Sequence, residues 1–279
     1  MHRRQMLGWL GALPFSLWSS AEAAPARPLR LGIMPFNSTL ALFKTHQPLR
    51  QHLQNELGRS IEFYTAPDYF TFLNSSLAGE YDILITGPHF GVMCLEAYEA
   101  LVRYKAVLQP VFVVRPNAGI QSLNDLRGKR IGLSSRLSIS SIGGVKWLAD
   151  QGMQMGRDYQ LFERTTHGAA VAAVAVGELD AALTTHTPLR QVPEDVRAKV
   201  SILPIEVRVP HLMTLAHKRL GKVDIKRIRE ALLKFGLTAE GLSFFKETGY
   251  EGYAPITAED VQSLQPYVSL TRTLLGHPS

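Results

Sequence analysis

Five serines stand within the eight residues 134–141, between a predicted strand and a predicted helix. Residues 131–133 have the length and apolar character of a strand, and apolar residues from Val145 onward recur at helical spacing. The free N–H groups of a first helical turn and nearby serine hydroxyls are all hydrogen-bond donors. The pattern therefore predicts either a cradle for a tetrahedral or planar oxyanion, or a helix cap followed by solvated loop. The serines at the predicted helix start are Ser138, Ser140 and Ser141.

Composition narrows the class of protein. The chain has 279 residues, 46% of them hydrophobic and 19% charged, which is typical of a well-packed globular protein. The net charge of +6 is not gathered into a basic run with interleaved aromatics, so we expect no nucleic-acid partner. Cys94 is the only cysteine, so the chain cannot form an intramolecular disulfide or a cysteine-rich metal cluster.

The first 23 residues read as a signal peptide. Arg3 and Arg4 precede an apolar run over residues 6–18, and residues 21–23 form a small-x-small cleavage site. The two arginines are also typical of a twin-arginine signal, although an ordinary secretory signal fits as well. No later apolar run is long enough to cross a bilayer. We expect a mature protein that is soluble and lies outside the cytoplasm, cleaved near Ala23.

Strands alternate with helices along the mature chain, which favours α/β architecture with mostly parallel sheets. One predicted helix carries Val92, Leu95 and Ala100. The β-α pattern restarts after residues 115–117, and extended stretches separate the two series. We expect two lobes that are joined by two extended hinge crossings and enclose a ligand cleft. Lobe 1 would hold residues 24–112 and 213–279, and lobe 2 residues 113–212. Predicted strands cover residues 29–34, 61–65, 82–85, 101–108, 111–114, 131–133, 159–163 and 200–205.

Several short motifs, in order and spacing, resemble one protein family. The sequence is similar to the phosphate-, phosphite- and phosphonate-binding receptors of bacterial ABC importers, a branch of the type II periplasmic binding proteins. The similarity spans nearly the whole mature chain. Its motifs cover residues 32–35, 66–69, 81–83, 126–131, 166–170 and 177–182.

This resemblance implies an oxyanion site in the interlobe cleft, without metal or cofactor. The serine cluster (Ser138, Ser140 and Ser141) and His167 would bind from the second lobe, and Tyr69 and Thr86 from the first. Thr185 and His186 would stand in the cleft wall, and His211 either faces the cleft or turns away from it. The resemblance also implies a periplasmic monomer, whose partner is an ABC permease or, alternatively, a membrane histidine kinase that senses the anion.

The sequence departs from the family where members hold amine-bearing phosphonates. Thr86 replaces a tyrosine, and neither residues 184–187 nor residues 209–211 contain the carboxylate that would pair an ammonium group. These changes favour a small inorganic oxyanion or a phosphonate with an uncharged tail.

Two other interpretations stay open. Cys94 is either a buried apolar side chain or a thiolate ligand for a soft oxyanion. A secreted enzyme is the less favoured class, because the chain has neither a His-x-x-x-His pair nor a Gly-x-Ser-x-Gly elbow.

Overall fold

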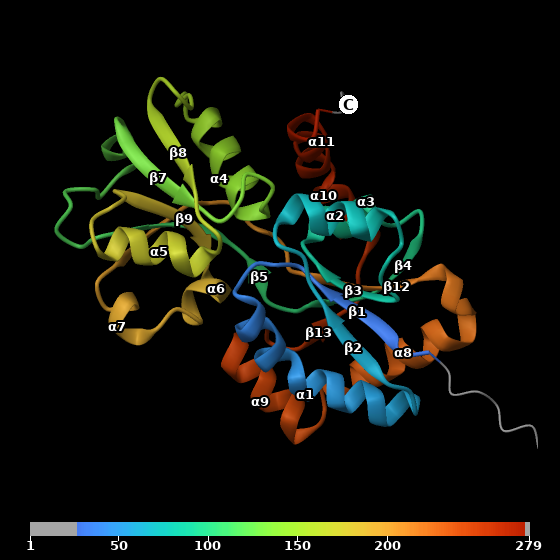
Figure 1. Cartoon of the computed structure of the whole chain (residues 1–279). Coiled ribbons are helices and arrows are strands. Elements are labelled where there is room, and N and C mark those ends of the chain that lie inside the picture. The colour runs from blue at the N-terminus through green and yellow to red at the C-terminus, as the bar shows by residue number, and fades with distance from the viewer. Residues whose placement is uncertain (1–26, 277–279) are drawn as a thin grey trace, which may run out of the picture.

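Two β-sheets form the cores of two lobes that lie side by side (Figure 1). This computed structural model describes residues 27–276, so the predicted signal peptide, with Arg3, Arg4 and Ala23, lies outside the described residues. Within residues 27–276, no helix is both long enough and apolar enough to span a membrane.

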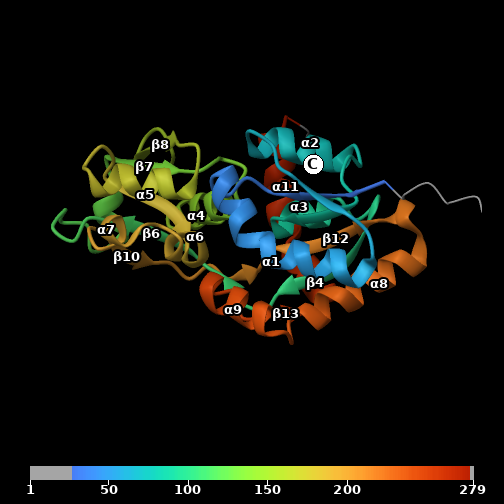
Figure 2. The same cartoon turned by 60° about the horizontal axis from the view of Figure 1, so that its bottom comes forward.

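Lobe 1 is built on a six-stranded sheet with the order β13-β4-β12-β3-β1-β2. Helices cover both of its faces: α1, α8 and α9 lie on one side, and α2, α3, α10 and α11 on the other (Figures 1 and 2). Its strands are β1 (Leu29–Ile33), β2 (Ile61–Tyr64), β3 (Ile83–Thr86), β4 (Tyr98–Tyr104), β12 (Met213–His217) and β13 (Tyr253–Ala254). Its helices are α1 (Thr39–Leu57), α2 (Tyr69–Leu77), α3 (Pro88–Met93), the 3-10 turn η2 (Lys218–Leu220), α8 (Gly221–Phe235), α9 (Ala239–Thr248), α10 (Ala258–Ser263) and α11 (Gln265–Leu274).

Lobe 2 is built on a five-stranded sheet with the order β10-β6-β9-β7-β8. Alternate residues of its central strands face opposite sides: Phe112 packs in one cluster with Leu148 of α4, and Val111 in another with Val171 of α5. The strands are β6 (Pro110–Val114), β7 (Lys129–Leu133), β8 (Tyr159–Glu163), β9 (Ala181–Thr185) and β10 (Ser201–Pro204). The helices are the 3-10 turn η1 (Leu123–Leu126), α4 (Ile139–Asp150), α5 (His167–Ala175), α6 (His186–Arg190) and α7 (Glu194–Arg197).

The chain crosses between the lobes twice, and the two crossings pair with each other. β5 (Val107–Leu108) and β11 (Val209–Pro210) form a short antiparallel ribbon. The predicted lobe boundary after residue 112 falls within β6, whose five residues all pair with β9. Because a strand pairs as a unit, we propose that lobe 2 begins at Pro110.

The sheets are mixed, whereas the sequence pattern predicts mostly parallel ones. β6 runs antiparallel to β9 and β10, and β12 runs antiparallel to β3 and β4. Both strands come directly from a crossing. They enter their sheets at the interlobe edge, where the parallel strands end, and must therefore run the opposite way. The parallel pairs are β1 with β2, β1 with β3, β7 with β8 and β7 with β9.

One predicted helix is wrong in extent. Val92 lies in α3, but α3 ends at Met93, and Ala100 lies in strand β4. Residues 98–104 place Tyr98, Val102 and Tyr104 in the core of lobe 1, and their pairing with β12 overrides the weak helical spacing. The other predicted strands named above are present within a few residues of their expected bounds.

Candidate anion-binding site

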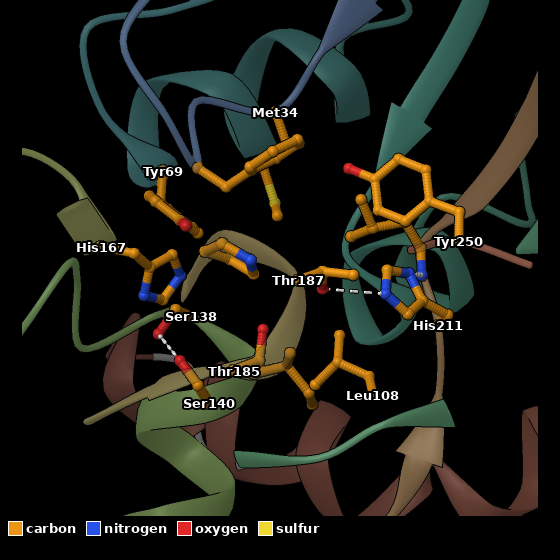
Figure 3. A pocket seen from close by; sticks show the side chains of 14 residues that line it. Met34, Tyr69, Leu108, Ser138, Ser140, His167, Thr185, Thr187, His211 and Tyr250 are labelled. Atoms are coloured by element: carbon orange, nitrogen blue, oxygen red, sulfur yellow. Dashed lines mark hydrogen bonds between the residues drawn. The ribbon is translucent and has the colours of Figure 1, made fainter. Parts of the chain in front are cut away.

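A small cavity lies between the lobes, at the ends of strands β1 and β9 (Figure 3). Its volume is about 30 Å³, roughly the space of two water molecules at ~10–15 Å³ each. The carboxyl ends of parallel strands are where α/β sheets bind ligands. The cavity is lined by Met34, Phe36, Tyr69, Leu108, Ser138, Ile139, Ser140, His167, Thr185, Thr187, Pro188, His211, Leu212 and Tyr250.

The serine cluster forms the N-terminus of α4. Ser138 is the N-cap, and its Oγ accepts a hydrogen bond from the backbone N–H of Ser141 at 3.1 Å. The Oγ atoms of Ser138 and Ser140 are 3.0 Å apart, and both residues are buried. Gly144 lets the helix lie close to β9, because a Cβ there would stand 2.4 Å from the side chain of Leu183. This close approach holds the helix start against the cavity.

His167 is the first residue of α5, after the N-cap Thr166. Its Nε2 lies 3.2 Å from Ser134 Oγ, and its Nδ1 is buried without a hydrogen-bond partner among the described residues. Burial lowers the pKa of His167 to about 4. The ring is therefore neutral at pH 7, with one nitrogen able to donate and the other able to accept.

Tyr69 reaches the cavity from lobe 1. It is the first residue of α2, whose N-cap Asp68 accepts from the backbone N–H of Thr71 at 2.7 Å. The side chain is buried, and its hydroxyl has no hydrogen-bond partner among the described residues. Burial also raises the pKa of Tyr69, so the hydroxyl keeps its proton. Figure 3 shows this hydroxyl pointing into the cavity beside His167.

Two threonines and a histidine complete the polar lining. Thr185 ends β9, and Thr187 lies in the first turn of α6. The Oγ1 of Thr187 is 3.1 Å from Nε2 of His211, which stands on the return crossing between β11 and β12 (Figure 3). The remaining lining is mainly apolar, and none of the described residues that line the cavity is Lys, Arg, Asp or Glu. No group of three or more His, Cys, Asp and Glu side chains within residues 27–276 is arranged to hold a metal ion.

Two hydrogen bonds join the lobes beside the cavity. His89 Nε2 in α3 donates to the carbonyl of Leu137 in lobe 2 at 2.9 Å. Asn37 Nδ2 in lobe 1 donates to Gln191 Oε1 in lobe 2, also at 2.9 Å. Burial lowers the pKa of His89 to about 4, so this ring is also neutral at pH 7. The loop that leads into α4 is thus tied to lobe 1.

The structure gathers five of the eight sequence-predicted site residues around the cavity: Tyr69, Ser138, Ser140, His167 and Thr185. The other three lie outside its lining. Thr86 is fully buried at the end of β3, Ser141 turns its hydroxyl to Ser138 Oγ at 2.7 Å, and His186 is exposed on α6. His186 and Thr187 are adjacent in the first turn of α6, and of the two only Thr187 has its side chain in the cavity wall.

Sequence reasoning missed several lining residues. Thr187 and Met34 each follow the end of a strand, and this position in the sequence could have indicated that they lie near the cavity. Tyr250 comes from the loop after α9, where no local pattern marks it as a site residue.

Cys94 does not line the cavity. It is the C-cap of α3 and packs in the core of lobe 1, 2% exposed. Burial raises the pKa of its thiol to about 12. Cys94 is thus buried away from the candidate site, which favours its interpretation as a buried apolar side chain over that of a thiolate ligand.

Comparisons with known proteins agree with this architecture. The family described as ABC transporter, phosphonate, periplasmic substrate-binding protein matches residues 31–261. Among solved structures, PhnD1 from Prochlorococcus marinus in complex with methylphosphonate aligns with a TM-score of 0.77 and 15% identity, over 89% of this chain and 98% of that chain. The binding-protein component of a phosphonate ABC transporter from Pseudomonas aeruginosa gives 0.76 and 13%, over 88% and 87%.

A histidine kinase sensor domain with similarity to periplasmic binding proteins is a more distant neighbour. It aligns with a TM-score of 0.58 and 16% identity, over 82% of this chain and 98% of that chain. At such identities the structural matches show the shared fold, that of the type II periplasmic binding proteins. The family match covers well over half of the 279 residues. The chain therefore belongs to the phosphonate periplasmic substrate-binding proteins of ABC transporters.

Proposed function

We propose that this protein binds a small oxyanion of the phosphate, phosphite or phosphonate type between its lobes and delivers it to an ABC importer. The observation that carries the proposal is the convergence of buried donors from both lobes on one cavity. Tyr69 comes from lobe 1, and Ser138, Ser140 and His167 come from lobe 2. Hydroxyl and N–H donors replace the water that an anion loses on entering such a site.

The helix starts add to this donor set. α4 has twelve residues and α5 has nine, and both begin at the cavity. The first N–H groups of a helix lack partners within the helix, and the helix dipole makes that end mildly positive. Two such ends beside one cavity favour negative charge without a lysine or arginine.

We propose that the protein acts as a monomer and has no catalytic role. His167 approaches Ser134, as in a nucleophile pair, but its Nδ1 has no partner among the described residues and no carboxylate lines the cavity. A serine nucleophile is normally activated by a histidine that a third group orients. The alternative partner is a membrane sensor kinase. The two-lobed fold is compatible with both roles, since the kinase sensor domain shares it.

The first prediction concerns the donors. Ser140→Ala and His167→Ala should each weaken the binding of phosphite and methylphosphonate by about tenfold or more, because a hydrogen bond to a charged group contributes roughly 1.5–3 kcal/mol. Isothermal titration calorimetry measures the change. The matched control is His186→Ala, which alters an exposed histidine outside the cavity lining.

Trp147 gives an independent readout. It is the only tryptophan after the predicted signal peptide, and it lies in α4. Its emission should respond to these anions with single-site saturation. An unchanged affinity in His167→Ala would remove His167 from the site.

The second prediction concerns selectivity. The protein should bind phosphate, phosphite or methylphosphonate more tightly than 2-aminoethylphosphonate. A buried ammonium group without a partner costs several kcal/mol, and no carboxylate among the described residues lines the cavity. Competition calorimetry with these four anions tests this. Tightest binding of 2-aminoethylphosphonate would contradict the proposed site.

The third prediction concerns export. Family membership places the protein in the periplasm, and we propose that its signal is cleaved so that the mature chain begins at or near Ala24. N-terminal sequencing of periplasmic protein should show this start, whereas a start at Met1 would refute it. Replacing Arg3 and Arg4 by lysine should block export only if the twin-arginine route is used.

A further inference from the structure

His211 and Thr187 form a buried pair in the cavity wall that joins the return crossing to lobe 2. His211 is 1% exposed and Thr187 is 7% exposed, and both line the cavity. The ring of His211 packs edge-on against Tyr104 and Tyr250, with ring centroids 5.6 and 5.1 Å away. Its position is therefore fixed by packing as well as by hydrogen bonds.

The hydrogen bonds determine which nitrogen of His211 carries the proton. The backbone N–H of Leu212 donates to Nδ1 at 2.8 Å, so Nδ1 must be unprotonated. A neutral ring then carries its proton on Nε2, which lies 3.1 Å from Thr187 Oγ1. Burial and the positive charge of Arg103 lower the pKa of His211 to about 3, which keeps the ring neutral at physiological pH.

This arrangement makes the Thr187 hydroxyl an acceptor towards His211. The structure gives that hydroxyl no other hydrogen bond within residues 27–276. Its own proton is therefore left to point at a group in the cavity. A free threonine hydroxyl can rotate to donate or accept, but here one of its lone pairs is already engaged.

We propose that His211 is a positioning residue that holds Thr187 as a hydrogen-bond donor to the bound anion. This inference rests on the proposed function. Thr187 lies on α6, whereas the serines lie on α4, so the anion receives donors from more than one side (Figure 3). The ligand must then present an acceptor oxygen to Thr187. If the ligand presented a hydrogen-bond donor to Thr187 instead, the proton of this buried hydroxyl would have no acceptor.

The test compares two substitutions of Thr187 by calorimetry with phosphite and methylphosphonate. Thr187→Val keeps the shape of the side chain and removes the hydroxyl, so it should weaken binding about tenfold or more. Thr187→Ser keeps the hydroxyl and should stay within about threefold of the wild type, a difference of under 1 kcal/mol. Equal affinity of Thr187→Val and the wild type for both anions would overturn the inference.

A double-mutant cycle tests the role of His211. His211→Leu should weaken binding when Thr187 is present and have little further effect in the Thr187→Val background, because the histidine acts through the threonine. Additive losses would overturn the positioning role.

Nitrogen-15 NMR of the unsubstituted protein gives a readout that does not depend on whether a variant folds. It should show His211 protonated on Nε2 and unprotonated on Nδ1 between pH 5 and pH 8. Protonation of Nδ1 would overturn the inference. If the wild type bound neither anion, the proposed function would fail, whereas the NMR result would still report the His211 tautomer.

Discussion

The constraint on which this site depends is that a charged ligand must be held by neutral groups. Of the described residues that line the cavity, none is a lysine or arginine, and burial keeps His167 and His211 neutral at physiological pH. Neutral donors can replace the hydration of an anion only if several of them converge in fixed positions, because each alone contributes little. In the proposed site, the starts of α4 and α5, the hydroxyl of Tyr69 and the Thr187–His211 pair would supply those positions.

The fold meets this constraint by placing strand ends and helix starts of two sheets face to face. β1 and β9 both end at the cavity. β6 and β12, which follow the two crossings, run antiparallel to β9 and β3 because they enter their sheets from that side. The paired crossings, β5 and β11, leave the lobes joined by a narrow ribbon. A site whose donors come from both lobes is complete only when the lobes meet, and under the proposed function their approach would signal binding to the membrane partner.

Local sequence predicted the elements that carry the site better than the contacts between them. The places of Ser138, Ser140 and His167 beside the cavity were predictable, because a helix start has a recognisable polar signature and lies where a strand has just ended. Thr86 and His186 also stand at such places, but Thr86 is buried outside the cavity lining and His186 is exposed to solvent. His186 and Thr187 are neighbours on α6, but only Thr187 faces the cavity. The periodicity of the sequence does not tell which of two adjacent residues will do so. Tyr250 and the state of His211 depend on packing between distant segments, which no local pattern reports.

A crystal structure of the mature protein with bound phosphite would test the central claim most directly. We expect the anion in the interlobe cavity, with its oxygens within hydrogen-bonding distance of Ser138 and Ser140 from one lobe and Tyr69 from the other. No lysine or arginine side chain should contact it. An anion bound outside this cavity, or one held by an arginine or lysine, would contradict the account.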